Sequence, residues 1–303
     1  MVTVYSSAAF SAVFGKETSY GVGSSGGKQY GALGIGMSLD TFSLQNQLDY
    51  IYQLGQRPPS NVYTAGRNVD IGTKFILADD AALTGSWLDF ILQNNGANPP
   101  VWNVGEQASA YLLINTGAGN QYEISGVAFD TAGLTIATGK PVEVTVTGKG
   151  AGANYLTSTS TTVQYPSSPV TWTGIVLSVD GTPIAQPVTD LTINIKNSNQ
   201  MFYTLGNVQY VAFVPTKFEV SGSFTVLHGS TPNYASEIFA NDLSGSAAHT
   251  LSFTAGIAGG STVQYTFNAG SVFYDEDSLH IQPVDPVTDK ITFKGLTLQV
   301  SVS

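Results

Sequence analysis

A strand-like segment occurs twice in this chain, first as SLDTFSLQNQLDYIYQLG (38–55) and again as TDLTINIKNSNQMFYTLG (189–206). When the Leu-Gly pairs that end the two segments are aligned, Phe42 falls on Ile193 at an offset of 151 residues. Apolar and polar residues alternate in the first part of both segments, which is typical of a half-buried β-strand. The chain is therefore expected to form the same strand twice.

The repeat extends well beyond this segment. Further pairs of identical or similar residues lie at offsets of 143 to 151 residues, and changes in loop length would cause such a drift. These pairs are Leu44 and Ile195, Asn46 and Asn197, Gly72 and Gly222, Leu77 and Leu227, Ser86 and Ser236, Gln121-Tyr122 and Gln264-Tyr265, Pro141-Val142 and Pro286-Val287, and Lys149-Gly150 and Lys294-Gly295. A solenoid has a much shorter period, so we predict a tandem duplication of one domain.

The duplication divides the chain into three regions. Residues 1–37 are predicted to form an N-terminal arm and a flexible loop, because the dense glycines of residues 21–36 do not favour a regular element. Residues 38–160 are predicted to be the first domain and residues 161–303 the second, with a Ser/Thr-rich run at their boundary. Two like domains in one chain suit an assembly with an even number of similar units around an axis.

Each domain is predicted to be mainly β, an antiparallel β-sandwich or open barrel with one short helix between its early and late strands. The first helix is expected within residues 78–96 and the second within residues 233–243. The side chains expected to pack on the two sheets are Trp87, Leu88 and Ile91 from the first helix, and Ile238 and Phe239 from the second.

Charged residues are scarce in this chain. It has 11 Lys and Arg and 21 Asp and Glu, which is 11% of its residues, and its net charge is −10. About a quarter is usual for soluble domains. A polar surface with few charges suits extensive protein–protein contact, because desolvating ions is costly; it would also suit an extracellular adhesin. The acid excess disfavours nucleic-acid binding, which needs Lys and Arg.

The chain contains no cysteine, so disulfides, zinc thiolates and thiol nucleophiles are excluded. Its first residues lack the basic start and the dense apolar run of a signal peptide. No stretch approaches the ~20 apolar residues that a transmembrane helix needs. We therefore expect neither secretion nor membrane association.

No group of residues points to catalysis or to a bound cofactor. The three histidines, His228, His249 and His280, are far apart in the sequence, so a packed or solvent-facing role is favoured over a metal site. Asp79 and Asp80 are better placed at a helix start than as a catalytic pair. Neither a G-x-S-x-G motif nor a phosphate-binding loop is present. The sequence predicts no enzyme, no cofactor and no metal.

One acidic run leaves two interpretations open. Asp275, Glu276 and Asp277 follow an apolar segment, and carboxylates in such a run can bind a cation such as Ca²⁺. The favoured interpretation is a polar turn between strands.

The tryptophans also allow two interpretations. Trp87, Trp102 and Trp172 could line a platform for sugars. Aromatic residues are also common in protein cores and subunit contacts, and these roles are favoured here.

Four segments together resemble the tail tube proteins of tailed phages. GKETSYG (15–21) is similar to the G-x-E-x-x-Y-G arm of that family, and QRPP…AGRNVDIGTKF (56–75) resembles its loop-then-strand segment. YEISGVAFD…GKPVEVTVTGKG (122–150) resembles its closing strands, and FEVSGSFTV (218–226) is similar to a later strand. Each motif is weak alone, and their order is more specific.

The resemblance implies a structural virion protein, the major tail tube subunit, assembled in the host cytoplasm. Single-domain members form hexameric rings, so a duplicated chain would close as a homotrimer with pseudo-sixfold symmetry. Rings would stack into a hollow tube and contact other tail proteins. Viral DNA would pass through the tube without specific binding. The inner wall of the tube is expected to be acidic. The residues implied as contacts between subunits or rings are Glu17, Tyr20, Gly21, Arg57 and Arg67.

Two other functions compete with this interpretation. A secreted or surface carbohydrate-binding adhesin with a β-sandwich fold would use exposed aromatic residues, and it would need a signal peptide. A β-sandwich hydrolase would use acidic residues, and it would need a convergent catalytic site. The sequence displays neither feature.

Overall fold

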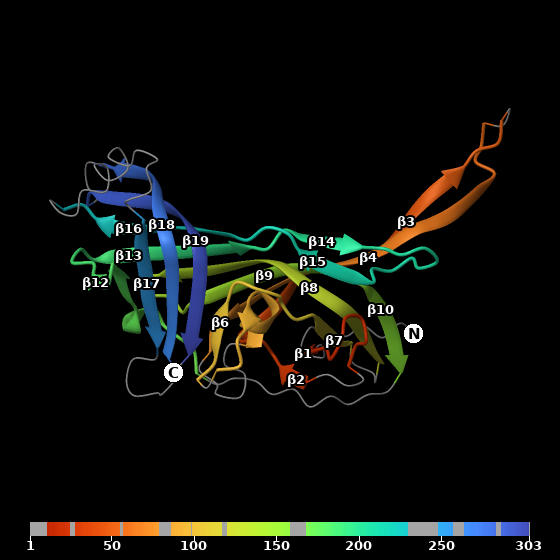
Figure 1. The fold of residues 1–303 in the computed structure, drawn as a ribbon, viewed down its shortest axis with the longest axis horizontal. Helices are drawn as coiled ribbons and strands as arrows, with labels where there is room; N and C mark the ends of the chain where they lie inside the picture. Colours follow the sequence, from red (N-terminus) through yellow and green to blue (C-terminus); the bar gives the residue numbers. More distant parts are fainter. Residues whose placement is uncertain are drawn as a thin grey trace, which may run out of the picture.

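The protein is mainly β. The computed structural model describes residues 11–24, 28–54, 57–78, 86–97, 99–116, 120–157, 168–229, 248–256, 264–282 and 286–302. Within these ranges, 17 strands form one antiparallel sheet and two more form a separate hairpin (Figure 1). No helix in this part of the chain has the length and apolar character needed to cross a lipid bilayer.

Seven strands of the sheet form a first strand set. Their order in the sheet is β2-β1-β7-β8-β9-β4-β3, and every neighbouring pair is antiparallel. The bounds are β1 (Ser11–Lys16), β2 (Lys28–Gly31), β3 (Ile35–Ile51), β4 (Asn61–Ile76), β7 (Ala110–Asn115), β8 (Asn120–Ala137) and β9 (Glu143–Gly150). A further strand, β10 (Gly152–Thr157), continues β9 and pairs with the start of β8.

Seven later strands form a second strand set with the same order. The sequence of neighbours is β12-β11-β17-β18-β19-β16-β13, again all antiparallel. The bounds are β11 (Val176–Val179), β12 (Thr182–Pro183), β13 (Val188–Lys196), β16 (Glu219–Leu227), β17 (His249–Gly256), β18 (Gln264–His280) and β19 (Thr288–Val302). Each strand of one set therefore has a counterpart in the other, taken in the order of the chain.

The pairing registers also correspond. The β8–β9 ladder has a bulge between Phe129 and Thr131, and the β18–β19 ladder has one between Tyr274 and Glu276. With these bulges aligned, residues of β8 and β9 correspond to residues of β18 and β19 that lie 145 positions later. The offset of 145 for Lys149-Gly150 agrees with this register.

Three of the sequence matches differ from the sheet register, namely Gly72 with Gly222, Leu77 with Leu227, and the Gln-Tyr match. In the sheet, Val69 pairs with Gly150 and Val220 pairs with Gly295, so residues of β4 correspond to residues of β16 at an offset of 151. Gly72 therefore corresponds to Ser223 rather than to Gly222. Likewise, the offset of 145 in β8 differs from the 143 of the Gln-Tyr match. Identical residues one or two positions away outweighed the true register, because matching by residue identity carries no information about strand pairing.

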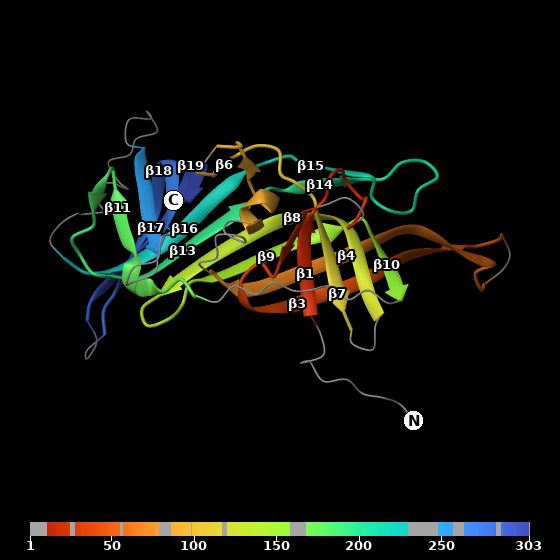
Figure 2. The ribbon, with the colours of Figure 1, turned by 90° about the horizontal axis from the view of Figure 1, so that it is seen from below.

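The two strand sets join through β8 and β13. Seven residue pairs connect them, from Asp190 opposite Ala137 to Lys196 opposite Thr131. Figure 2 shows β9, β8, β13 and β16 side by side at the centre of the molecule. The result is one continuous sheet in which β3 and the end of β18 lie far from this junction.

A large hydrophobic core covers one face of the sheet, and Val13, Tyr111 and Leu113 form a small separate cluster. The large core contains buried residues of both strand sets, including Phe14, Phe129, Phe224 and Phe293. In Figure 1, β1, β2, β6 (Val101–Asn103) and β7 lie on the same side of the long strands β8 and β9. Alternate residues of the long strands point into this core, as the period of two in a strand requires.

The predicted first helix is not confirmed as an α-helix, and residues 79–85 of it lie outside the described residues. The described part of residues 78–96 contains a 3₁₀ helix, η2 (Ser86–Phe90), followed by a short strand, β5 (Gln93–Asn94), and no α-helix occurs in the described ranges. The side chains of Asn94 and Asn95 accept hydrogen bonds from the N–H groups of Gly96 and Ala97, at 2.8 and 2.9 Å. Such local bonds compete with helix formation. The predicted second helix lies outside the described residues.

The described part of residues 1–37 contains strands where an arm and a loop were expected; residues 1–10 and 25–27 lie outside the described residues. Ser11–Lys16 and Lys28–Gly31 are strands β1 and β2, and β1 lies between β2 and β7 in the sheet. Val13 and Phe14 are fully buried. Strand β1 was missed in the sequence because it contains few apolar residues and its alternation of apolar and polar residues is short. It also lies close to the glycine-rich run.

Candidate assembly surface

Glu17 ties the loop after β1 to the sheet. Its carboxylate is buried and accepts N–H bonds from Gly21 at 3.1 Å, Gly23 at 2.8 Å and Gly126 at 2.9 Å. Gly21 and Gly23 have φ values of 79° and 67°, a backbone conformation that favours glycine. The G-x-E-x-x-Y-G segment therefore builds a closed loop on the chain's own strand β8.

Tyr20, in the same loop, packs against the second strand set's hairpin. This hairpin consists of β14 (Asn199–Phe202) and β15 (Ala212–Pro215), and the rings of Tyr20 and Phe213 lie 5.4 Å apart. Burial, followed by the negative charge of Glu17, raises the pKa of Tyr20 well above its usual value. Glu17, Tyr20 and Gly21, predicted as contacts between subunits, thus all make contacts within the chain.

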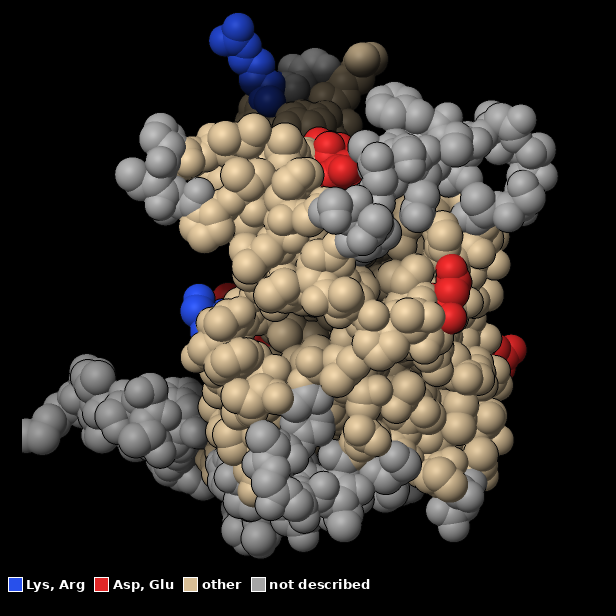
Figure 3. All heavy atoms as spheres, turned by 90° about the vertical axis from the view of Figure 1, so that its left-hand side faces the viewer, with Lys and Arg blue, Asp and Glu red and all other residues tan. Residues whose placement is uncertain are grey.

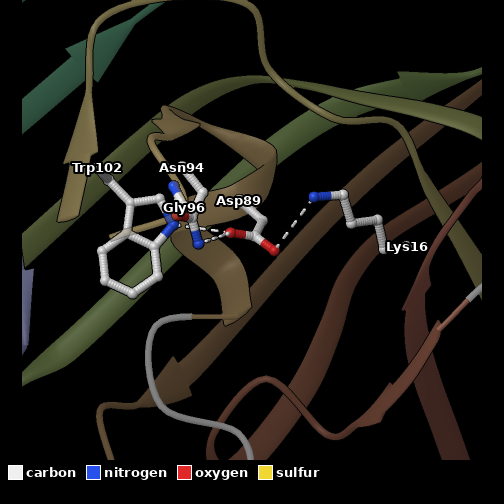
Figure 4. Close-up of polar contacts among 5 residues, drawn as sticks. All are labelled: Lys16, Asp89, Asn94, Gly96 and Trp102. Carbon is white, nitrogen blue, oxygen red and sulfur yellow. Dashed lines mark hydrogen bonds and ion pairs between the residues drawn. The ribbon is translucent and has the colours of Figure 1, made fainter. Parts of the chain in front are cut away.

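A buried carboxylate organises the segment that was predicted to be helical (Figure 4). Asp89 accepts hydrogen bonds from the indole N–H of Trp102 at 2.7 Å and from the amide of Asn94 at 3.3 Å. Its other oxygen lies 3.6 Å from the Nζ of Lys16 on β1. These bonds hold η2, β5, β6 and β1 together, which is a structural role.

The tryptophans do not form a shared platform. Trp87 and Trp102 are buried in the core, and the ring of Phe75 lies edge-on to Trp87 with centroids 6.4 Å apart. Trp172 is 41% exposed and lines a shallow groove with Ile136 and Asp190. Leu88 and Ile91 are buried beside Trp87, whereas Ile238 and Phe239 lie outside the described residues.

The acidic run engages separate partners. Asp275 pairs with Lys294 at 2.9 Å, and Glu276 accepts a hydrogen bond from Ser278. Asp277 faces the other side of the strand, where burial and then the charge of Asp289 raise its pKa. In the described ranges no three His, Asp or Glu side chains are grouped to hold a metal ion.

Two of the three histidines each face a carboxylate. The Nδ1 of His228 lies 2.8 Å from Asp289, and the Nδ1 of His249 lies 2.7 Å from Asp180. The hydrogen bond from His249 lowers the pKa of Asp180. These pairs connect neighbouring strands, and His280 is exposed at the end of β18, where it pairs with Thr288 of β19.

Equivalent apolar residues differ sharply in exposure. On β8, Leu134 is 4% exposed and Ile136 is 5% exposed, because β13 lies alongside them. Their counterparts 145 positions later are 51% exposed in Leu279 and 67% exposed in Ile281. The described strand that pairs with Asp277–His280 is β19, and no other described strand pairs with the opposite edge of this segment.

The edge of β3 shows the same contrast. Ile195 on β13 is 3% exposed, whereas its counterpart Leu44 on β3 is 49% exposed. In the described part of the chain β3 pairs along its length with β4, and β13 pairs with both β16 and β8. The third strand of one set, β3, and the end of the sixth strand of the other, β18, are thus edges that no further described strand covers, and they carry exposed leucines and isoleucines.

A long hairpin projects beyond the body of the protein. The distal parts of β3 and β4 form it, and Figure 1 shows it extending at the upper right. Arg57 is exposed near its tip, and Arg67 lies nearer its base, where its Nε donates a hydrogen bond to Asn46 at 3.0 Å. The exposed apolar side chains of the hairpin are Leu48, Tyr50, Ile51, Tyr52, Leu54, Val62 and Tyr63.

The counterpart of this hairpin is folded back onto the chain. In the sequence, the β14–β15 hairpin is the connection from β13 to β16, just as the projecting hairpin is the connection from β3 to β4. The N–H of Arg67 donates to the carbonyl of Val208 at 2.7 Å, and the hydroxyl of Tyr203 donates to the carbonyl of Arg67 at 3.4 Å. One hairpin is thus seated on the first strand set, and the other extends away from the body.

Few charges interrupt the surface at the second strand set. Figure 3 shows this end of the molecule as mostly uncharged, with isolated acidic groups. Such a surface can be buried against another protein with little ion desolvation. The sequence did not reveal these edges, because Leu279 and Ile281 align with Leu134 and Ile136, which a neighbouring strand covers.

Comparison with known proteins agrees with a structural role. A family model described as phage tail tube protein matches residues 9–300, which is nearly the whole chain. No curated protein matches the chain.

Proposed function

This chain belongs to the phage tail tube protein family, and from that premise we propose that three copies close into a ring of six similar units. The rings stack into a hollow tube that carries viral DNA without binding it specifically. The tube joins other tail proteins, and it is built in the host cytoplasm. The protein acts as a structural part of the tail, with no enzymatic role.

The observation that carries this proposal is the twofold occurrence of one strand order. It supports a duplicated unit, with one copy in residues 38–160 joined by β1 and β2, and the other in residues 161–303. The β8–β13 pairing is then a contact between two units that happen to share a chain. Since the resemblance implies six units in each ring, two units in each chain require three chains.

The polar face of the sheet is our candidate for the channel wall. The opposite face is covered by the core, and the polar face carries hydroxyl pairs such as Thr131 with Thr147 at 2.6 Å. Lys74 is paired with Glu143 at 2.7 Å. A lysine held by a carboxylate is less available to phosphates, and each phosphate contact adds affinity for DNA. The pairing of lysines with carboxylates, together with the overall excess of acidic residues, would thus keep DNA mobile in the channel.

Native mass spectrometry of the purified protein, together with class averages of negatively stained rings, tests this proposal. We expect a mass of three chains and six similar lobes in each ring. A protein that stays monomeric at high concentration, or a ring of six whole chains, would contradict it.

A further inference from the structure

The pairing of β8 with β13 within the chain shows how the two strand sets join. The edge of the sixth strand of one set binds the edge of the third strand of the other. Within this pairing, Leu134 lies opposite Ile193 and Ala132 opposite Ile195. The apolar residues of both strands are buried by this pairing together with the core. The same two kinds of strand edge occur elsewhere on the molecule, in β3 and at the end of β18, and there no described strand covers them.

We propose that β3 of one copy adds to the edge of β18 in the next copy, antiparallel, with Phe42 opposite Leu279. This register follows from the junction: Phe42 is the counterpart of Ile193, and Leu279 is the counterpart of Leu134. Thr41 then lies opposite His280, as Thr192 lies opposite Thr135 in the chain. The proposal rests on the ring proposed above and adds its closing contact.

The exposure of the residues supports a second copy as the occupant. Leu44, Leu279 and Ile281 would be covered by this addition, as Ile195, Leu134 and Ile136 are covered in the chain. Burying apolar surface favours association. An open edge with exposed apolar residues is also a hazard for aggregation, and closing the ring removes it from every copy.

The location of the two hairpins agrees with the same contact. The β14–β15 hairpin of the chain lies over Arg67 and Gly152, next to the β8–β13 junction. The counterpart of Gly152 in the second strand set is Thr297, beside Leu296, which is 67% exposed. When β3 pairs with the next copy, its projecting hairpin extends along that copy's β19 and covers this exposed residue.

Paired cysteines test the register directly, because the chain has no cysteine of its own. The test variant is Thr41→Cys with His280→Cys in the full chain. The variant Thr192→Cys with Thr135→Cys forms the equivalent pair within one chain and shows that the geometry permits a disulfide. Thr41→Cys with Ser278→Cys is the control, shifted by two residues along the strand.

After mild oxidation of assembled tubes, we expect the test variant to form covalent dimers and trimers on a non-reducing gel, and the shifted control to remain mostly monomeric. Tubes that form while the test variant stays monomeric, with the in-chain pair oxidised, would overturn the register and leave the proposed function intact. Failure of the unmodified chain to form rings would instead overturn the proposed function.

A mixing experiment covers the case in which the double variant does not assemble. One chain then carries only Thr41→Cys and the other carries only His280→Cys. A cross-linked pair made of both chains supports the register, and its absence from mixed tubes contradicts it.

Discussion

Asp277 of β18 occupies the position that Ala132 occupies in β8. Asp277 lies opposite Ile291 of β19, as Ala132 lies opposite Val146 of β9, and both side chains face the apolar side of the sheet. The Oδ1 atom of Asp277 is buried and has no hydrogen-bond partner among the described residues. One of the two equivalent sites therefore holds an ionisable group where the other holds a methyl group.

This substitution predicts a pH dependence. Burial and the nearby charge of Asp289 raise the pKa of Asp277, while His228 opposes the shift. A carboxyl whose pKa is raised in the folded chain binds its proton more tightly there than in the unfolded chain, so its contribution to stability is lost as the pH rises through its folded pKa. We expect Asp277→Asn to stabilise the protein at pH 7 in urea unfolding and to reduce the gain in stability on acidification.

Asp180→Asn is the matched control, with the opposite sign. The hydrogen bond from His249 lowers the pKa of Asp180, so its contribution is present at neutral pH and is lost as the pH falls through the folded pKa. We expect this variant to be less stable at pH 7. A lower stability of Asp277→Asn at pH 7 would contradict the account of Asp277.

Leu279→Asp should separate assembly from folding. Leu279 is exposed in the isolated chain, and surface changes usually alter the free energy of unfolding by about 0.5 kcal/mol or less. We expect ring formation to be lost while the melting temperature of the monomer hardly changes. The equivalent change Leu134→Asp buries an unpaired carboxylate and should cost at least ~2 kcal/mol. Normal rings of Leu279→Asp would show that this edge is not an interface.

Trp87→Ala should destabilise the fold by about 3–5 kcal/mol, because a large buried ring is removed from the core. Chemical denaturation measures the change in the free energy of unfolding. Trp172→Ala is the matched control and should have a small effect, since Trp172 is partly exposed. Equal effects of the two variants would contradict the core role of Trp87.

Asp89→Ala should cost about 1–3 kcal/mol, because the indole N–H of buried Trp102 loses its acceptor. Asp89→Asn keeps an oxygen at this place and should retain much of the stability. The Lys16 pair contributes little, since Lys16 is partly exposed. Thermal unfolding compares the variants. A larger loss of stability in Lys16→Met than in Asp89→Ala would contradict this account.

Deleting residues 1–37 should impair folding. The deletion removes β1, whose Phe14 is fully buried between β7 and the core. Phe14→Ala alone should cost about 3–5 kcal/mol. Circular dichroism of the truncated chain measures the effect. An intact, cooperative melting transition would instead support the predicted N-terminal arm and flexible loop.

The sequence predicted the strands better than their partners. Alternation identified β3, β4 and β13, because a half-buried strand imposes a period of two. It failed over Ser86–Asn95, where buried residues follow one another and asparagine side chains capture the backbone. It also missed β1, which is short and lies beside a glycine run.

The candidate assembly surface could be predicted only in part. The repeat indicated which residues are equivalent, and alternation indicated which face of each strand is apolar. Neither indicates which strand lies alongside, because pairing across the β8–β13 junction depends on contacts between residues about 60 positions apart in the chain. The exposure of Leu279 is therefore visible only when the sheet is known.

An electron cryomicroscopy map of the assembled tube, at a resolution that separates strands, tests the central claim most directly. We predict three chains in each ring and a strand order in which β3 of every chain lies against Asp277–His280 of the next, with Phe42 opposite Leu279. A ring of another copy number, or a β3 edge that faces solvent in the assembled tube, would contradict it.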